Sequence, residues 1–583
     1  MRYKELQALF RRRFNIPKER PIKRAINSFT LAERSIFSLF VGLFVISGLT
    51  LLWNASDAFM KQVPIKGGAL AEGVVGNPRF INPVLALSEA DKNLTALIYS
   101  GLLRVTPSGE VVNDLANSLT ISENKLKYTL TLSEHARFHD GTRVTADDVV
   151  FTVNKISDPL IKSPRRGNWD GVTVEKVDDT TVTFTLKKAY TPFIYNLTTG
   201  ILPKHIWKNV TADEFSFSQF NTLPIGSGPY QVERVERNDG GIPNYYQLSP
   251  YETEGQHVFI ENLSFRFYSS ETTLINAYNS GDVESVGGVS PENIGELDTK
   301  NAQIIYSPLP RVFAVFFNQS QSKVLLNKEV RTALNLAAPK SEIVHDILNG
   351  YGIAIDSPLP VSLYGSSDKS FASSTEESLT HAREVLTQAG WKENGDTHLL
   401  EKRVGNATIP LSFSLSTGDA PELRQVAEEL VNKWEKLGAK IEIVTFETGE
   451  LNQSVIRPRH FEALLFGEVV GREADLYPFW HSSQRNDPGL NIALYANSKA
   501  DKLLEEARSV SDKETADARY QAFGDELEKD LPAVFLYSPS YLYVIPKKLQ
   551  AVSLGSLSVS QDRFLGIRDW YIETDKVWKI FLN

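Results

Sequence analysis

Cysteine is absent from this chain of 583 residues. Its absence excludes disulfide bonds, thiolate metal sites, a cysteine nucleophile and lipid attachment through an N-terminal cysteine. It is compatible with a protein that works outside the cytoplasm. Apolar residues make up 42% of the chain and charged residues 23%, which favours a well-packed globular protein over disorder. A chain of this length is expected to fold as two or three lobes.

Common enzyme motifs are missing as well. The sequence contains no GxSxG, HExxH, GxxxxGK[ST] or dinucleotide-binding GxGxxG pattern. Its nine histidines are scattered without a recognisable ligand spacing, so we predict no catalytic residue, no metal site and no cofactor. The glycine-rich stretch PIGSGPY at 224–230 lacks the lysine and the following helix of a phosphate-binding loop. We interpret it as a bend at which two backbone segments approach each other closely.

Basic residues are concentrated at the N-terminus. Residues 1–34 contain ten Lys or Arg against three Asp or Glu, a balance of +7, whereas the whole chain has a net charge of −9. The remainder therefore carries −16. Such an acidic body argues against nucleic acid as a partner, because phosphate-binding surfaces are basic.

A charge-free stretch follows the basic segment, with no charged residue from Ser35 to Ser56. Its core, SIFSLFVGLFVISGLTLLW at 35–53, would span roughly 28 Å as a helix, close to the thickness of a bilayer's hydrocarbon core. We therefore predict a single transmembrane helix at 35–53, with 1–34 in the cytoplasm and the rest of the chain outside. A signal peptide cleaved near SDA at 56–58 is the alternative. Residues 54–65 are expected to be a linker.

Periodic patterns further along the chain predict alternating strands and helices. Strand-like alternation occurs in KLKYTLTL at 125–132 and TTVTFTL at 180–186. Amphipathic helices are predicted at 329–337, 377–390 and 421–438, and the last leads directly into the strand AKIEIVTFE. Helix-then-strand order of this kind is typical of α/β layers.

The stretch FHDGTRVTADDVVFTV at 138–153 allows two readings. One is a metal or acid–base site built from His139, Asp147 and Asp148. The other is a turn at Asp140–Gly141 followed by a helix that Thr145 caps, with the two aspartates in its first turn. Adjacent aspartates on a helix point about 100° apart and cannot share one substrate, so we favour the turn and the capped helix.

The order of these features resembles family 5 of the extracellular solute-binding proteins, the oligopeptide, dipeptide and nickel receptors of ABC importers. The resemblance begins with IYSGLLRVTPSGEVVNDLANSL and continues to FHDGTRVTADDVVFTVNKI within residues 98–156, and PIGSGPY matches the family's GTGPY. It covers about 75–560. Its later matching segments are RVFAVFFNQS (311–320), VRTALNLAAPKSEIVHDILNGYGIAIDSPLP (330–360), ADLYPFWHSS (474–483), NSKADKLLEEAR (497–508) and LPAVFLYSPSYLYV (531–544).

This resemblance implies a two-lobed α/β fold of the type II periplasmic-binding-protein kind, with an extra inserted subdomain, that closes over its ligand. The expected divisions are 66–106, 206–308 and 536–583 for lobe I, 107–205 for the inserted subdomain, and 309–535 for lobe II.

The resemblance also implies ligand-binding residues. Asp475 aligns with an aspartate that accepts the α-ammonium of a peptide in relatives, through a charge-assisted hydrogen bond. A loop aspartate that caps a turn is an equal alternative for this position. The further expected ligand contacts are Gly471, Arg472, Glu473, Tyr477, Trp480, Tyr537 and Glu89. Core packing is an equal alternative for Tyr477 and Trp480. The family's "AiDr" aspartate is replaced at Ala338–Pro339, which is expected to alter a local helix.

We therefore predict a non-enzymatic, monomeric receptor that captures peptides and delivers them to an ABC permease and its ATPase subunits. It would be held in the cytoplasmic membrane by the helix at 35–53. A nickel chelate, an oligosaccharide or another solute is the alternative ligand on the same fold, and an anchored hydrolase is the least favoured function.

Overall fold

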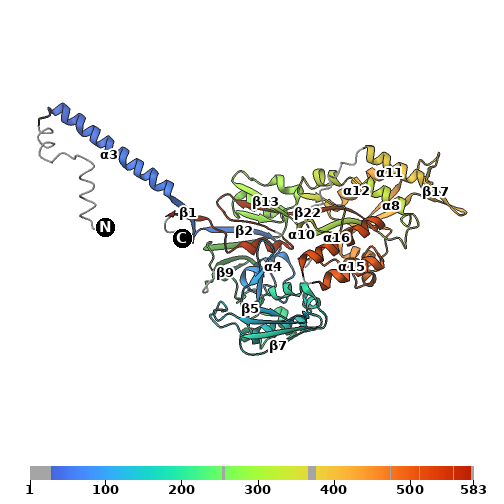
Figure 1. Ribbon diagram of the computed structural model, residues 1–583, viewed down its shortest axis with the longest axis horizontal. Coiled ribbons are helices and arrows are strands. Elements are labelled where there is room, and N and C mark those ends of the chain that lie inside the picture. The colour runs from blue at the N-terminus through green and yellow to red at the C-terminus, as the bar shows by residue number, and fades with distance from the viewer. Residues whose placement is uncertain are drawn as a thin grey trace. The chain divides into compact units, whose positions relative to one another are not determined.

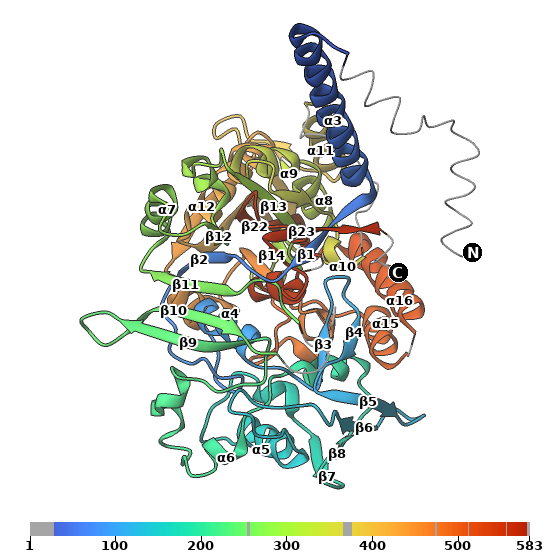
Figure 2. The same cartoon turned by 90° about the vertical axis from the view of Figure 1, so that its left-hand side faces the viewer.

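The computed structural model describes residues 28–252, 257–364, 376–472, 475–510, 512–555 and 557–579. The chain divides into two compact units, Met1–Ile65 with Glu573–Asn583, and Lys66–Ile572. Both are drawn in Figure 1 and, turned by 90°, in Figure 2.

The smaller unit consists of one long helix and a two-stranded ribbon. Helix α3 (Leu31–Phe59) contains a segment, Leu31–Leu51, that is long and apolar enough to cross a membrane, a test that a signal sequence also meets. Strand β1 (Met60–Ile65) follows directly and pairs antiparallel with β23 (Glu573–Trp578) near the other end of the chain. Residues 54–65, which were predicted to be a linker, therefore form the end of α3 and the strand β1. All six residues of β1 are paired with residues of β23.

The larger unit is built on a twelve-stranded sheet with two halves. The β2 half contains β2 (Ala69–Val75), β9 (Tyr230–Arg237), β10 (Pro243–Pro250), β11 (Asn262–Tyr268), β12 (Ser285–Gly287) and β13 (Ala302–Pro308). The β14 half contains β14 (Arg311–Phe317), β15 (Gly352–Ala354), β19 (Ser412–Gly418), β20 (Lys440–Phe446) and β21 (Ala463–Val469).

The long strand β22 (Ala533–Pro546) joins the two halves. Its first residues pair with β14, and its last residues pair with β12 and β13. This strand is the apolar segment AVFLYSPSYLYVIP, and it is buried along nearly its whole length. One continuous strand therefore belongs to both halves.

Helices and short strands cover the two halves. The β2 half carries α4 (Glu89–Ile98), α7 (Glu271–Ser280), η5 (Pro291–Glu296) and η9 (Ser560–Gly566). The β14 half carries α8 (Lys328–Leu336), α9 (Lys340–Glu342), η6 (Ile343–Ile347), α10 (Val361–Tyr364), α11 (Glu376–Gln388), α12 (Pro421–Glu435), α13 (Thr448–Glu450), η7 (Leu451–Ile456), α14 (Tyr477–Trp480), η8 (Ser482–Gln484), α15 (Ser498–Ser509) and α16 (Lys513–Asp530). Its outlying three-stranded sheet is β16 (Lys392–Glu393), β17 (Leu400–Val404) and β18 (Ala407–Pro410).

A small-sheet region, residues 107–205, extends from the β2 half and lies at the bottom of the larger unit in Figure 1. Its four-stranded sheet has the order β5-β6-β8-β7. Its elements, with the strand β3 just before it and two short helices just after it, are β3 (Leu103–Val105), β4 (Val111–Asn113), β5 (Ala116–Ile121), β6 (Lys127–Leu132), α5 (Ala146–Ser157), η1 (Arg166–Trp169), β7 (Val172–Lys176), β8 (Thr181–Leu186), η2 (Thr191–Thr198), α6 (Lys204–Trp207), η3 (Phe215–Phe217) and η4 (Gln219–Asn221).

These bounds confirm the predicted periodicities. The two alternating segments are β6 and β8, and the three amphipathic segments are α8, α11 and α12, with β20 directly after α12. Helix α8 ends at Leu336, and α9 begins at Lys340 with Pro339 as its N-cap. The helix is therefore interrupted at Ala338–Pro339, where the family's aspartate is replaced. Within the serine-rich stretch 357–378, residues 365–375 lie outside the described residues.

The FHDGTRVTADDVVFTV stretch is a turn and a capped helix, as predicted. Gly141 has φ +84°, and its N–H donates to the carbonyl of Phe138 over 2.8 Å. Thr145 is the N-cap of α5, and its amide and hydroxyl both donate to Asp148, over 2.9 and 2.7 Å. Burial lowers the pKa of His139 to about 4, so this imidazole is neutral.

The PIGSGPY bend is also confirmed as a close backbone approach. The amide of Gly228 donates to the carbonyl of Ile98 at the end of α4 over 2.8 Å. A Cβ on Gly226 or Gly228 would overlap the carbonyls of α4, so no other residue fits.

Candidate ligand cavity

A cavity of about 560 Å³ lies between the small-sheet region and the β14 half. Its volume falls within the range of small-molecule sites. On the small-sheet side it is lined by Gly167, Asn168, Asp170, Gly171, Val172, Leu186, Lys187, Lys188, Tyr190, Phe193 and Asn196. On the other side it is lined by Val469, Gly471, Asp475, Pro478, Phe479, Leu490 and Arg508.

The loop after β21 brings two of the predicted ligand contacts, Gly471 and Asp475, to this cavity. Val469 pairs with Arg311 at the end of the strand, and the amide of Val470 donates to the carbonyl of Pro310 over 2.9 Å. The chain then turns, and Asp475 precedes the short helix α14. Its Oδ1 accepts the amide N–H of Tyr477 over 3.1 Å, which holds the carboxylate against the helix start.

Asp475 forms an ion pair with Arg508, the last basic residue of α15. The Oδ2 of Asp475 lies 3.0 Å from Nη2 of Arg508. The guanidinium carbon is 4.3 Å from the ring centre of Tyr477 and 5.1 Å from that of Tyr190, which belongs to the small-sheet region. Both distances are within the range of cation–π attraction.

The Asp475 carboxylate is nearly enclosed, with 8% of the residue exposed. Burial raises its pKa above the usual value, while Arg508, the Tyr477 amide and the Tyr190 hydroxyl counteract the rise. The same burial raises the pKa of Tyr520, which lies near the pair, and Asp475 adds to that effect. The carboxylate is therefore held mainly by donors of its own chain.

Two of the predicted ligand residues, Gly471 and Asp475, line the cavity. Tyr477 does not line it, but its ring supports Arg508 and also stacks on His481, with ring centres 4.0 Å apart. Trp480 is fully buried and packs against aromatic residues of the core. Of the two roles expected for it, ligand contact and core packing, the structure shows core packing.

Arg472 contacts the other half of the sheet. Its Nη2 lies 2.5 Å from Oδ2 of Asp562 in η9, and both side chains are nearly buried. Asp562 also accepts the backbone amides of Ser558 and Val559 over 2.7 and 3.0 Å. The Arg472 guanidinium therefore pairs with a fixed carboxylate. Glu473 lies outside the described residues.

Tyr537 and Glu89 lie away from the cavity lining. Tyr537 is fully buried in β22, its hydroxyl donates to Glu422 over 2.6 Å, and its ring stacks on Phe313 with centres 4.8 Å apart. Burial raises the pKa of both Tyr537 and Glu422. Glu89 is exposed in the first turn of α4, close to Gly288.

Sequence reasoning missed Arg508 and Tyr190. Arg508 ends the segment NSKADKLLEEAR, and it follows the buried Leu504 by one helical turn, so its position at the border of the buried face could have been inferred. Tyr190 follows β8 in an irregular stretch, and no periodicity indicates that it faces Arg508.

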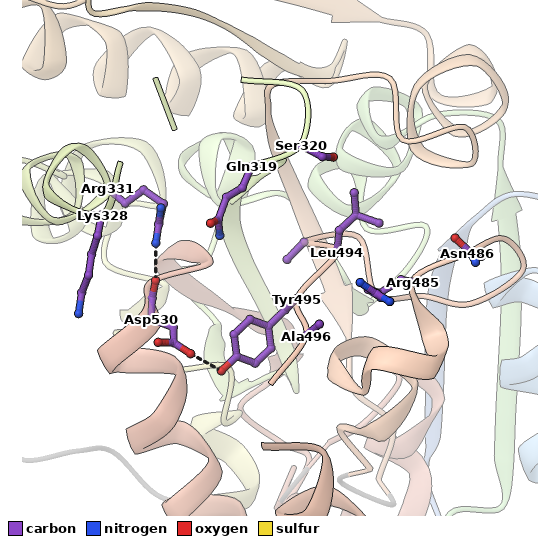
Figure 3. A pocket seen from close by; sticks show the side chains of 11 residues that line it. Gln319, Ser320, Lys328, Arg331, Arg485, Asn486, Leu494, Tyr495, Ala496 and Asp530 are labelled. Carbon is purple, nitrogen blue, oxygen red and sulfur yellow. Dashed lines mark hydrogen bonds between the residues drawn. The ribbon is translucent and has the colours of Figure 1, made fainter. Parts of the chain in front are cut away.

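A second cavity, of about 670 Å³, lies in the β14 half beyond the C-terminal end of β14. Its residues are bonded among themselves: Tyr495 donates to the Asp530 carboxylate over 2.7 Å, and Arg331 donates to the Asp530 carbonyl over 2.9 Å (Figure 3). No predicted ligand residue lines this cavity in the described structure, so we place the candidate site at the smaller one.

Metal ligands do not gather in the described part of the chain, where no three His, Asp or Glu side chains lie close enough to hold an ion.

The chain matches the family model "Bacterial extracellular solute-binding proteins, family 5 Middle" over residues 110–489. It is 27% identical over 517 residues to the oligopeptide-binding protein AppA of Bacillus subtilis, an alignment covering 85% of this chain and 91% of AppA. It is 23% identical over 496 residues to the probable D,D-dipeptide-binding periplasmic protein DdpA of Escherichia coli, covering 82% and 90%.

Solved structures show the same likeness. AppA from Bacillus subtilis in complex with a nonapeptide superposes with a TM-score of 0.65 at 26% identity, covering 88% of this chain and 100% of that one. NikZ from Campylobacter jejuni in complex with Ni(L-His) superposes with a TM-score of 0.65 at 26% identity, covering 86% and 99%.

The chain therefore belongs to family 5 of the bacterial extracellular solute-binding proteins, which serve ABC importers. The predicted periplasmic-binding-protein fold is confirmed, and the relatives are solute-binding proteins rather than enzymes.

Proposed function

We propose that this protein captures peptides outside the cytoplasmic membrane and delivers them to an ABC permease driven by ATPase subunits. The observation that carries the proposal is the 560 Å³ cavity, in which Gly471 and Asp475 face the small-sheet region of a family 5 fold. AppA holds a nonapeptide in its solved structure, and DdpA is a probable D,D-dipeptide-binding protein, which supports peptides as the ligand class.

In this proposal the β2 half and the β14 half are the two lobes, with 107–205 as the inserted subdomain of lobe I and 309–535 as lobe II. Several contacts cross this division. Besides Arg472 and Asp562, the hydroxyl of Thr191 donates to the carbonyl of Val510 over 3.1 Å. A ligand that touches both sides favours the closed arrangement by its differential affinity.

The proposed attachment is the apolar helix α3, which would hold the protein in the cytoplasmic membrane with the binding unit outside. Its length and its basic N-terminal flank support an anchor. Cell fractionation with an N-terminal tag tests this point, because an anchored protein keeps the tag in the membrane fraction, whereas a cleaved signal peptide loses it.

Peptide binding is tested with the full-length chain purified in detergent. Native mass spectrometry should detect co-purified peptides, and a diverse library of di- to nonapeptides should raise the melting temperature without being hydrolysed. We expect one bound peptide per monomer. No bound peptide and no thermal shift across the library would reject the proposal, and turnover of a peptide would indicate an enzyme instead.

A metal chelate is a second candidate, because NikZ holds Ni(L-His). Since no three metal-binding side chains gather in the described residues, nickel would have to enter as a preformed chelate. The isotope pattern of a co-purified ligand in native mass spectrometry separates this case from a peptide.

A further inference from the structure

The carboxylate of Asp475 has little room for a ligand ammonium. Its Oδ1 accepts the Tyr477 amide, and its Oδ2 is paired with Arg508. Because 8% of the residue is exposed, solvent cannot replace a lost partner easily. A peptide ammonium at Asp475 would therefore have to compete with a cation that the chain supplies itself.

Displacement of Arg508 is unfavourable for a second reason. Its guanidinium contacts the rings of Tyr477 and Tyr190, which come from opposite sides of the cavity. Moving it would separate the charge from Asp475 and from both rings at once. A ligand ammonium would gain one of these interactions while the protein lost all three.

The other polar groups of the cavity favour a ligand group that accepts hydrogen bonds. The Nε–H of Arg508 is enclosed and has no acceptor among the described residues. Among the lining residues that the structure describes, the charged side chains left beside the Asp475–Arg508 pair are Lys187, Lys188 and Asp170, two positive and one negative. An oxygen of the ligand can accept hydrogen bonds from the two lysines, whereas an ammonium cannot.

We propose that Arg508 determines specificity at this end of the cavity by serving as the built-in counter-ion of Asp475. The ligand group bound there is an uncharged or anionic hydrogen-bond acceptor, such as an acylated amino terminus or a carboxylate, and not a free ammonium. This inference rests on the proposed function, because it assumes that the cavity holds a peptide-like solute.

Paired peptides test the inference directly. The full-length protein is titrated calorimetrically with tetrapeptides of one sequence that carry either a free or an acetylated amino terminus. We expect the wild type to bind the acetylated form at least as tightly as the free form. Arg508→Gln exposes the Asp475 charge to the ligand, so it should shift the preference at least tenfold toward the free amine. The double variant Arg508→Gln, Asp475→Asn should lose that preference.

A matched ion pair outside the cavity provides the control. Arg568 and Asp114 lie 2.9 Å apart, with side-chain exposures of 19% and 4%, compared with 30% and 8% for Arg508 and Asp475. Arg568→Gln should leave the ratio of the two affinities unchanged. A change in this variant equal to that in Arg508→Gln would show that the shift reflects lost stability rather than the cavity.

A second measurement needs no peptide. Arg508→Ala leaves a space beside Asp475 that a small cation can fill, so millimolar methylguanidinium should raise its melting temperature. Neither the wild type nor Arg508→Ala, Asp475→Asn should respond in this way. Absence of this rescue would overturn the counter-ion role of Arg508.

The two failures are distinguishable. A wild type that prefers the free amine at least tenfold would overturn the inference while supporting the proposed peptide function. Methylguanidinium rescue without binding of either peptide would reject the peptide function and, with it, the assignment of the ligand group, leaving Arg508 as a structural counter-ion.

Discussion

Two buried glutamates, one in each half of the large sheet, differ in the hydrogen-bond and ion-pair partners that surround them. Glu72 in β2 is fully buried and Glu468 in β21 is 4% exposed. Glu72 accepts Nε and Nη2 of Arg563 over 3.1 and 3.0 Å and the Tyr543 hydroxyl over 2.8 Å. The hydroxyl of Ser285 also donates to it. The carboxylate in the β2 half is therefore both neutralised and hydrogen-bonded.

Glu468 has no such partners. Neither of its oxygens has a hydrogen-bond partner of normal geometry among the described residues. Burial raises its pKa well above the usual range, and the nearby indole N–H of Trp480 offsets this only in part. Burial in the β14 half therefore favours the protonated form of its carboxyl, whereas the β2 half surrounds its carboxyl with a cation and hydrogen-bond donors.

Asp475 lies between these two extremes. It is paired like Glu72, but its partner Arg508 is 30% exposed and lines a cavity. The three carboxylates therefore differ in their surroundings: Glu72 is paired deep in the β2 half, Glu468 is buried without a cation among the described residues, and Asp475 is paired at a cavity.

Removal of Arg563 is expected to have the largest effect. Arg563→Met leaves the buried Glu72 without its counter-ion, which should lower the free energy of unfolding by about 3–5 kcal/mol. Urea denaturation followed by tryptophan fluorescence measures it. The double variant Glu72→Gln, Arg563→Met should recover most of the loss, and equal losses in both variants would show that packing rather than charge is responsible.

Removal of Arg508 should cost less. Arg508→Ala removes a charge-assisted hydrogen bond from a partly exposed pair, so we expect a loss of about 1.5–3 kcal/mol in the same denaturation experiment. A loss as large as that of Arg563→Met would mean that both pairs serve the fold alone.

Glu468 should make stability depend on pH in the opposite sense to a paired carboxylate. Because its folded pKa is raised, the stability that its protonated form contributes is complete below the unfolded value near 4.5 and is lost as the pH rises through the folded pKa. Above neutral pH, Glu468→Gln should therefore have a higher melting temperature than the wild type and a free energy of unfolding about 1–3 kcal/mol larger. Near pH 4 the two proteins should be equally stable. Melting curves from pH 4 to 9 test this, and parallel profiles would contradict the protonated state.

The smallest effect is expected where hydrogen bonds alone satisfy a buried carboxylate. Asp148 accepts the Thr145 amide and hydroxyl over 2.9 and 2.7 Å and the Lys204 amide over 2.8 Å, and it forms no ion pair with any residue that the structure describes. Thr145→Ala removes one of these donors and should cost about 1 kcal/mol. Thr145→Ser retains the hydroxyl and serves as the control, so an equal loss in both variants would assign the effect to the methyl group instead.

Much of the local structure was predictable because it depends on neighbouring residues. The Asp140–Gly141 turn, the Thr145 cap and the apolar stripe of Val149, Val153 and Ile156 are encoded within one stretch, and all are present. The order of such stretches also indicated the family. Of the predicted ligand contacts, Gly471 and Asp475 both line the cavity, and they belong to one short loop.

Pairings between distant segments were not predictable in the same way. The sequence placed Arg472 and Tyr537 among the ligand contacts, but in the structure Arg472 pairs with Asp562, and Tyr537 is buried against Glu422. Each of these partners lies in another element, and periodicity within one element carries no information about what packs across from it.

The sequence by itself determined the class of this protein: an apolar N-terminal helix, an acidic α/β body and an ordered set of motifs, all written in short-range patterns of polarity, turn residues and caps. The tertiary structure decided which carboxylate is paired, which has its pKa raised by burial and which faces a cavity. Those outcomes depend on the distance and burial of groups from separate segments, because the energy of a charge in a protein is set by its surroundings in space.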